Sequence, residues 1–505
     1  MALGLLAASA WPPQALAQTA APPAAQTATA QDTIDAARAA ARADRNSAAA
    51  DLFARAIAQA PQRRRELLQE YADQLNYSGR SREAIALFEE ALPSSSGDER
   101  LRLLKGLGLA YLWTDQPTRA RPVFETLVRE QPGDEDASRN LGRALSWSGR
   151  QRAAIAHLQQ HLRAHPQDDA ARVIQAQAQA WLGRPDAAAA TLTRVTSKRT
   201  EAEQLAANLE LARAPRTIAD AQRSSQSDHL DIRSARIGQT IGLAQGRGMA
   251  GVRVDRIAYD QRDGGDSARV TRPMVLGRYR FSDGVEANAE VGQERIRPLT
   301  GAAHDPTVYA AWLTLWPSDP WRFDLSANRN TFDNLKSLRL GITARQQGIS
   351  TDFTPDERQR YTARFEHAAY SDGNTRHNAQ FEAEYRWRTH PDAWFGLRHT
   401  RIRFDRQLDN GYFNPRSFES TQLTLRALWR PDGPEGRWDM AAGVAIGREH
   451  AVPDGTKPAH DAGVRVGWRF DPRTRVEARA QRFSSRTTES GFARTTFGLS
   501  LDRSW

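Results

Sequence analysis

The chain has 505 residues, more than one ordinary domain, so we predict two or three folding units. Its residues are 40% hydrophobic, and no apolar run approaches the roughly 18 residues of a spanning helix. This excludes a helical membrane protein but not a transmembrane β-barrel, in which apolar residues recur only at alternate positions. The net charge of +10 is spread over Arg residues that alternate with Asp and Glu, which argues against nucleic acid, and the lack of cysteine excludes disulfides.

The chain begins with features of an export signal. An apolar stretch at Leu3–Ala10 is followed by Ala15-Leu16-Ala17, the small-x-small pattern of a cleavage site, so we predict a signal peptide over residues 1–17. No basic segment precedes it, and we expect the true start to lie slightly upstream. An Ala-rich disordered leader is the alternative. Residues 18–30 are Ala, Thr, Gln and Pro and are predicted to form a disordered leader.

An internal repeat follows. A small residue and a large apolar residue four positions later recur every 34 to 36 residues, at Ala49/Phe53, Ala84/Phe88, Ala120/Phe124, Ala154/Leu158 and Ala188/Leu192. This is the tetratricopeptide period. Each such unit buries its apolar stripe only against its neighbours. We therefore predict an α-solenoid of five tetratricopeptide repeats over residues 31–224, with residues 199–222 as its last helix.

An aromatic residue precedes the turn between the paired helices of four repeats. The turns read Tyr77-Ser-Gly-Arg, Trp113-Thr-Asp, Trp147-Ser-Gly-Arg and Trp181-Leu-Gly-Arg. Gly is the expected left-handed helix terminator at such a position. We predict that these repeat-turn aromatics pack against the helix end, and contact with a ligand is the alternative.

From residue 228 the hydrophobic period changes to two. In residues 380–388 Phe381, Ala383, Tyr385 and Trp387 alternate with charged or amide residues. Short turns alternate with longer connections, as in outer-membrane barrels. We predict a transmembrane antiparallel β-barrel over residues 228–505, so the fold class is α+β multidomain. Fifteen strand segments are recognisable; parity requires 14 or 16, and 16 is favoured, with 238–251 and 335–357 as the uncertain regions.

The polar face of these strands predicts a wet pore. The candidate pore-lining residues are Glu286, Glu290, Glu382, Glu384, Arg386, Arg426, Arg430, Arg465, Arg469, Arg475, Glu477 and Arg479. Glu382 and Glu384 project the same way, about 7 Å apart, as a glycosidase pair would, but Arg continues the same face and favours a lining ladder. No catalytic constellation, metal-ligand spacing or cofactor motif is present. We predict that the chain is not an enzyme and holds no metal or cofactor.

The last strand carries an apolar face that ends in an aromatic residue. Phe497, Leu499, Leu501 and Trp505 share this face, and Arg503 interrupts it. We predict that this segment is the sorting signal read by the barrel-assembly machinery. The alternative is an edge strand of a soluble sandwich.

The combination resembles a known family. Trp-Ser-Gly-Arg turns in tetratricopeptide repeats, with Tyr370-Ser-Asp-Gly-Asn and Gly411-Tyr-Phe-Asn-Pro in the barrel, are similar to exopolysaccharide export porins of the poly-β-1,6-N-acetylglucosamine exporter type and, more remotely, to the cellulose synthase outer-membrane channel. The resemblance covers residues 35–505. It implies a 16-stranded barrel in the bacterial outer membrane. It also implies periplasmic repeats that bind an exopolysaccharide chain of the biofilm type, a periplasmic modifying enzyme or a synthase complex.

Two departures limit what the resemblance implies. The array has five repeats, fewer than is usual in the family, and the barrel has slightly more Arg and Lys than Asp and Glu. A cationic, partly deacetylated glycan would prefer an acidic lumen. We expect an export porin for a poly-N-acetylglucosamine-like polymer. The alternative is a closed barrel that anchors the repeats as an interaction module, as in phage-receptor-like proteins.

Overall fold

The computed structural model describes residues 29–433, 436–484 and 493–505. The predicted signal peptide and all but the last two residues of the predicted leader lie outside these ranges. The chain divides into two compact units, one ending at Ser94 and one running from Ser95 to Trp505. Over the residues described, the first contains helices only, and the second contains further helices followed by a large sheet.

The first unit holds two helix pairs of the repeat array. Its elements are α1 (Ala30–Arg42), α2 (Asn46–Gln59), η1 (Pro61–Arg63), α3 (Arg64–Tyr77), α4 (Ser81–Ala91) and η2 (Leu92–Ser94). A capping box begins α1, since Thr29 accepts from the Asp32 N–H and the Asp32 carboxylate accepts from the Thr29 N–H. Ile34, Phe53 and Leu67 are fully buried between these helices. The apolar stripes are therefore satisfied by neighbouring helices, as the repeat predicts.

The second unit continues the array with α5 (Gly97–Trp113), α6 (Pro117–Glu130), α7 (Glu135–Trp147), α8 (Gln151–Ala164), α9 (Asp169–Trp181), α10 (Pro185–Leu192) and α11 (Thr200–Arg213). Paired helices approach closely at glycines. A Cβ on Gly108 would lie 2.7 Å from the Phe124 ring, and one on Gly142 would lie 2.5 Å from the Leu158 side chain. The predicted tetratricopeptide packing is confirmed. Among the described residues no helix is both long and apolar enough to cross a membrane.

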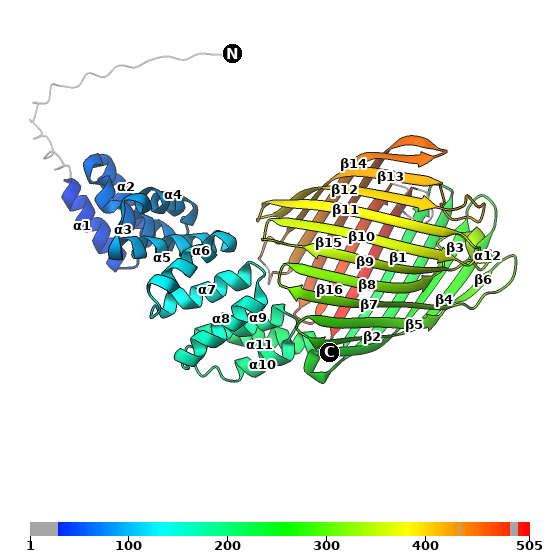
Figure 1. The fold of residues 1–505 in the computed structure, drawn as a ribbon, viewed down its shortest axis with the longest axis horizontal. Helices are drawn as coiled ribbons and strands as arrows, with labels where there is room; N and C mark the ends of the chain where they lie inside the picture. Colours follow the sequence, from blue (N-terminus) through cyan, green and yellow to red (C-terminus); the bar gives the residue numbers. More distant parts are fainter. Residues whose placement is uncertain (1–28, 434–435, 485–492) are drawn as a thin grey trace, which may run out of the picture. The chain divides into compact units, whose positions relative to one another are not determined.

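The sheet of the second unit closes on itself (Figure 1). Its strands are β1 (Arg216–Gln226), β2 (Leu230–Leu243), β3 (Gly248–Gln261), β4 (Ser267–Ser282), β5 (Val285–Gln293), β6 (Arg295–Pro298), β7 (Thr307–Ser318), β8 (Trp321–Asn330), β9 (Ala344–Phe353), β10 (Gln359–Tyr370), β11 (Thr375–Arg388), β12 (Asp392–Phe404), β13 (Ser417–Trp429), β14 (Trp438–Val452), β15 (Gly455–Asp471), β16 (Thr474–Phe483) and β17 (Arg494–Ser504). The one further helix, in the described residues between β8 and β9, is α12 (Leu335–Arg339), and η3 (Ala244–Gly246) joins β2 to β3.

Sixteen strand positions surround the barrel axis. β1 pairs antiparallel with both β2 and β17, which closes the ring. β5 and β6 both pair with β4 and are one strand interrupted at Glu294, so the seventeen segments fill sixteen positions. Every neighbouring pair is antiparallel. The favoured count of 16 is confirmed.

Two predicted elements are wrong. The last helix ends at Arg213 instead of running to residue 222, and β1 begins at Arg216, inside the range predicted for the repeats. This is the strand missing from the fifteen segments. Within the uncertain region 335–357 the sequence predicts a strand near residue 336, but this segment is α12, and the strand, β9, begins at Ala344.

The hairpin connections separate into two ends of the barrel. The short turns at 283–284, 319–320, 389–391 and 472–473 lie at one end, which we call the near mouth, and the longer connections at 299–306, 331–343 and 405–416 lie at the other, the far mouth. The predicted alternation of turns and loops is confirmed. The sequence also predicts a surface loop at 450–459, and this prediction is wrong, because β14 and β15 pair there up to Ala451 and Gly455.

Candidate functional site

The two faces of the barrel wall differ in chemistry. Directly paired residues of antiparallel strands point to the same face, so the register sorts every strand residue to one side. One face carries large exposed apolar side chains such as Phe381, Leu397 and Leu423, which share it by register. The other face carries charged side chains such as Glu382 and Arg398.

The charged face is the inner one. Neighbouring strands lie about 4.8 Å apart, so charged groups two strands apart meet only where side chains converge on the concave side. Arg426 of β13 contacts Glu384 of β11 at 2.5 Å, across β12. Arg253 of β3 contacts Glu290 of β5 at 2.8 Å, across β4. The lumen is therefore lined by ion pairs, and the apolar face points outward.

The structure places the twelve predicted pore-lining residues on this inner face or at its end. Ten of them form ion pairs: Glu286, Glu290, Glu382, Glu384, Arg386, Arg426, Arg465, Arg475, Glu477 and Arg479. Arg430 lies just past the end of β13, and Arg469 is near the end of β15, both at the near mouth. Acidic and basic groups alternate around the lumen instead of forming one-sign zones.

Sequence reasoning missed the partners of these residues. Asp439 pairs with Arg475 at 3.0 Å, and Asp220 pairs with Arg479 at 2.6 Å. Asp220 was missed because β1 was read as helix. Asp439 lies on the inner face of β14. The other inner positions nearby are Ala and Gly, so the sequence of this strand shows no charged face.

Aromatic rings also face the lumen. Trp394 is on the inner face of β12, with the Arg426 guanidinium 4.7 Å and the Arg360 guanidinium 5.4 Å from its ring. Trp312, paired with Asn288 on the inner face, is 38% exposed. Trp394 is buried beneath these guanidinium groups at 7% exposure, so of the two rings Trp312 is the one open to the lumen.

A loop crosses the lumen at the far mouth. We call residues 331–343, which include α12, the inner loop. Leu335 and Leu338 pack with Tyr259 of β3 and Ile296 of β6. Phe332 stacks on Tyr370 of β10 and belongs to a second buried cluster that extends to Phe418 of β13. Because these strands lie on either side of β8 and β9 around the ring, the inner loop spans the channel.

Polar contacts hold the inner loop in place. Asp333 accepts a hydrogen bond of 2.9 Å from the Tyr259 hydroxyl and pairs with Arg494 of β17 at 3.1 Å. The Ser337 hydroxyl donates to the Asn410 carbonyl at 2.7 Å, which joins the inner loop to the 405–416 connection. Since its anchors come from β3, β17 and a second loop, the inner loop is fixed from several sides.

The second loop supports the inner loop through Tyr412 and Gly411. The Tyr412 hydroxyl donates to Asp372 at 2.8 Å, and burial raises the pKa of Tyr412 to about 12, so the phenol stays neutral. Gly411 has a φ of +92°, and a Cβ there would lie 2.4 Å from the Asn334 side-chain oxygen. Glycine is required both by this conformation and by the close approach.

The near mouth is bound to the repeats of the second unit. The Asp319 carboxylate of the β7–β8 turn accepts from the Arg152 N–H at 3.2 Å, in the first turn of α8. The Arg152 side chain donates to the Trp316 carbonyl at 2.6 Å. Arg184, from a Gly-Arg turn, pairs with Asp283 at 2.6 Å. The turns of the last repeats therefore contact the turns of the barrel.

The repeat-turn aromatics are partly exposed. Tyr77, Trp113, Trp147 and Trp181 are 42% to 58% exposed. That these side chains pack against the helix end stays a prediction, as does the alternative of contact with a ligand. Trp147 and Trp181 line one open cavity of about 460 Å³.

Comparison with known families identifies the barrel. Residues 274–432 match the family described as the PgaA membrane beta barrel domain, and residues 72–135 and 111–179 match tetratricopeptide repeat families. The chain combines a PgaA-type membrane barrel with tetratricopeptide repeats. The match covers β4 to β13, the strands that carry the inner loop and much of the ion-paired wall.

Several solved structures are similar to parts of the chain. A bacterial polysaccharide outer membrane secretin is 13% identical, with a TM-score of 0.47 over 58% of this chain and 99% of its own. MamA from Desulfovibrio magneticus RS-1 is 17% identical, with a TM-score of 0.30 over 35% of this chain and 95% of its own. YrrB, a TPR protein with an unusual peptide-binding site, is 17% identical, with a TM-score of 0.30 over 36% and 94%. No curated protein sequence matches the chain.

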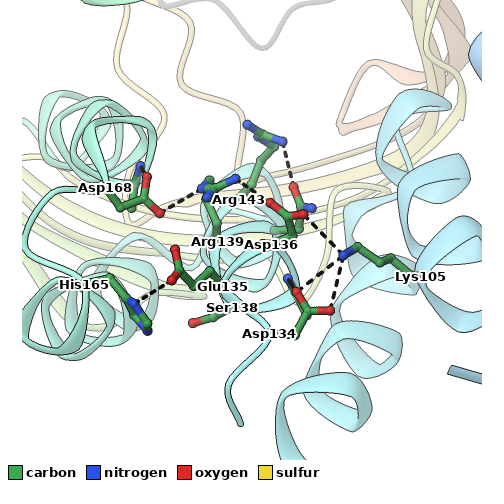
Figure 2. A network of polar contacts seen from close by, with 12 residues as sticks. Lys105, Asp134, Glu135, Asp136, Ser138, Arg139, Arg143, His165 and Asp168 are labelled. Atoms are coloured by element: carbon green, nitrogen blue, oxygen red, sulfur yellow. Dashed lines mark hydrogen bonds and ion pairs between the residues drawn. The ribbon is translucent and has the colours of Figure 1, made fainter. Parts of the chain in front are cut away.

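Ion pairs repeat between the helices that lead to the PgaA-type barrel (Figure 2). Lys105 pairs with Asp134 at 3.3 Å, and 34 residues later Arg139 pairs with Asp168 at 2.9 Å. Each Asp also accepts from a backbone N–H at the start of its helix, Asp168 from Ala171 at 3.0 Å. This hydrogen bond and the nearby His161 and Arg139 outweigh burial, so the pKa of Asp168 lies below its usual value. One carboxylate thus caps a helix and joins two repeats.

A Ser, His and Asp arrangement lies in the same repeats. His161 contacts Asp168 through Nε2 at 2.9 Å and Ser138 Oγ through Nδ1 at 3.0 Å. The sequence did not indicate it, because the residues come from two helices and a turn. Ser138 is 9% exposed and His161 is 5% exposed, so a substrate has no access and the contact is structural. That the chain is not an enzyme stays a prediction. In the described residues no group of three His, Asp or Glu is placed to hold a metal.

The terminal strand of the PgaA-type barrel has the predicted outer face. Phe497, Leu499, Leu501 and Trp505 are 40% to 61% exposed. The Arg503 guanidinium, which interrupts the face in the sequence, lies 4.6 Å from the Trp505 ring centre. The charge at that position is therefore stacked on an aromatic ring. That the terminal strand acts as a sorting signal stays a prediction.

Proposed function

We propose that this chain is an outer-membrane porin that exports a polysaccharide. The observation that carries the proposal is the inner face of the PgaA-type barrel, where ion pairs continue around the ring from Asp220 to Glu290 to Glu384. Such a wall offers many weak hydrogen-bonding partners and no deep site. Conduction requires such weak, repeated binding, because a polymer must be bound well enough to enter the lumen and weakly enough to leave it.

The charge of the wall favours a neutral glycan. Most lumen carboxylates, such as Glu384 and Asp439, have an Arg within ion-pair distance, so the wall presents no large field of one sign. A strongly cationic polymer would need unpaired carboxylates. We therefore favour an acetylated, poly-N-acetylglucosamine-like chain over a deacetylated one.

The repeats suit the periplasmic side of this pathway. Their last members contact the turns of the near mouth through Arg152 and Arg184, so a polymer or partner bound by the repeats is held beside the channel. We infer from this orientation that the far mouth faces the cell surface. The partners that fit it are the polymer itself and a periplasmic synthase complex or modifying enzyme.

Deletion and complementation test the export function. In a strain that lacks the gene we expect polymer to accumulate in the periplasm and to disappear from the surface, and the wild-type gene should restore it. Unchanged surface polysaccharide in the deletion strain would contradict the proposal. The measurement is polymer content in separated periplasmic and surface fractions.

The inner loop favours a second candidate, a closed barrel that anchors an interaction module. Its anchors at Asp333 and Ser337 reach across the lumen and fix it there. Planar-bilayer recordings distinguish the two. A barrel that conducts when the inner loop is released supports the export porin, and one that never conducts supports the anchor.

A further inference from the structure

One cavity in the repeats combines exposed aromatic rings with polar groups. It has a volume of about 460 Å³ and lies between α7, α9 and the start of α11. This volume is in the range of small-ligand sites. Trp147 and Trp181, 34 residues apart, contribute two indoles that are 42% and 53% exposed. An indole exposed at the same position in successive repeats is a feature that helix packing does not require.

The polar groups of the cavity are available for a ligand. The Arg143 guanidinium lies 5.8 Å from the Trp147 ring centre and donates to the Asn140 side chain at 2.7 Å. In the described part of the chain it has no carboxylate within ion-pair distance, and burial lowers the pKa of Arg143. Gln177 and Glu201 also line the cavity. A partly buried cation with spare N–H donors gains from a ligand that supplies neutral oxygen acceptors.

The walls of the cavity continue into the contact with the barrel. Trp147 is followed by Arg150, whose side chain donates to the Pro355 carbonyl of the β9–β10 turn at 3.3 Å. Trp181 is followed by Arg184, which pairs with Asp283 of the β4–β5 turn at 2.6 Å. Each indole is thus three residues from a contact with the near mouth. A ligand on the indoles is held next to the channel entrance.

We propose that this cavity is a subsite for uncharged hexose units of the exported chain, with rings stacked on Trp147 and Trp181 and hydroxyl or acetyl oxygens held by Arg143. The proposal rests on the export function. An uncharged unit is specified because Arg143 and Arg199 outnumber Glu201, so the cavity repels an ammonium group. A peptide is the competing occupant, and it is an outcome of the test.

Binding of soluble oligosaccharides to the full-length protein in detergent tests the subsite. The probes are the N-acetylglucosamine hexamer and the glucosamine hexamer, measured by isothermal titration. We expect the acetylated hexamer to bind more tightly than the glucosamine hexamer, and Trp147→Ala/Trp181→Ala to weaken its binding at least about tenfold, because both stacking faces are removed. Tyr77→Ala is the matched control, because it removes an exposed aromatic at the same repeat position outside the cavity.

A second variant guards against loss of folding. Arg143→Gln keeps the indoles and removes the cation, so it should narrow the preference for the acetylated over the glucosamine hexamer. The subsite is wrong if neither hexamer binds, or if the double variant binds the hexamers as the wild type does. It is also wrong if, in a cross-linking experiment, the double variant loses contact with a periplasmic protein while its hexamer binding is unchanged, because the cavity then holds a peptide. If the double variant binds normally while the deletion strain still fails to export, the subsite fails and the export function stands. If the deletion strain exports normally, the export function fails.

Discussion

At the scale of single residues, carboxylates organise the repeats. Asp169 is buried at the start of α9 and accepts hydrogen bonds from the Ser197 N–H at 2.7 Å and from the Thr196 N–H and hydroxyl at 3.0 Å. It also pairs with Arg172 at 2.5 Å. It therefore ties the segment after α10 to the body of the array. Burial alone would raise the pKa of Asp169, but these hydrogen bonds outweigh it and lower the pKa.

We expect Asp169→Asn to lower the free energy of unfolding of the repeats by roughly 1–3 kcal/mol, because an amide replaces a charged acceptor in these bonds. The folded pKa is depressed, so this stabilisation is present above the usual Asp pKa of about 3.9 and is lost as the pH falls further. Thermal melts followed by the helical circular dichroism signal between pH 3 and 7 measure it. Asp98→Asn, at an exposed carboxylate in the first turn of α5, is the control and should leave the melt unchanged.

In the lumen, a single carboxylate serves more than one guanidinium. Glu384 contacts Arg426 at 2.5 Å and Arg360 at 3.8 Å. In a barrel that conducts, we expect Glu384→Gln to shift ion selectivity towards anions, because both guanidinium groups lose their counter-charge. The reversal potential under a salt gradient measures the shift. Glu419→Gln removes the same charge from the outer face, where Glu419 pairs with Arg401, and an equal shift in that variant would disprove the assignment.

At the scale of elements, the sequence predicts those with a strong period and misses those without one. The strand over 380–388 is evident because large apolar residues alternate with charges. β1 is hidden because its outer face carries Ala219 and Ala221, which read equally well as helix. α12 is hidden because Leu335 and Leu338 are buried by strands far away in the sequence, and no local pattern encodes that contact. The pore-lining residues follow from alternation, but their partners depend on the ring closure.

The inner loop gives the element-scale prediction. We expect Gly411→Ala to displace this loop and raise single-channel conductance, because the added Cβ would meet Asn334 at 2.4 Å and Lys336 at 2.7 Å at a φ of +92°. Gly455→Ala is the control: it has a φ of +80° in a turn of the same mouth and nothing within 4 Å. Equal conductance of the two variants would show that the inner loop does not limit conduction.

At the scale of the whole molecule, the second unit joins tetratricopeptide repeats to a barrel. Gly-Arg turns of successive repeats provide the junction, and they are not equivalent. Gly149 and Gly183 have φ values of +80° and +78° and occupy the same position in adjacent repeats. A Cβ on Gly149 would meet nothing within 4 Å, whereas one on Gly183 would lie 2.6 Å from the Arg280 guanidinium at the end of β4. Substitution at Gly149 therefore tests the stability of the turn alone, whereas substitution at Gly183 tests both the turn and the contact with the barrel.

We expect Gly183→Ala and Gly149→Ala to destabilise their turns to a similar degree, about 1 kcal/mol, and only Gly183→Ala to loosen the junction. Hydrogen exchange at the Asp283 turn reports it, because the contact between Arg184 and Asp283 depends on the position of residue 183. Faster exchange there in Gly183→Ala alone, together with slower polymer export, would show that repeats and barrel work as one body. Equal exchange in the two variants would mean that the repeats act without being held at the near mouth, and export would then depend on the lumen alone.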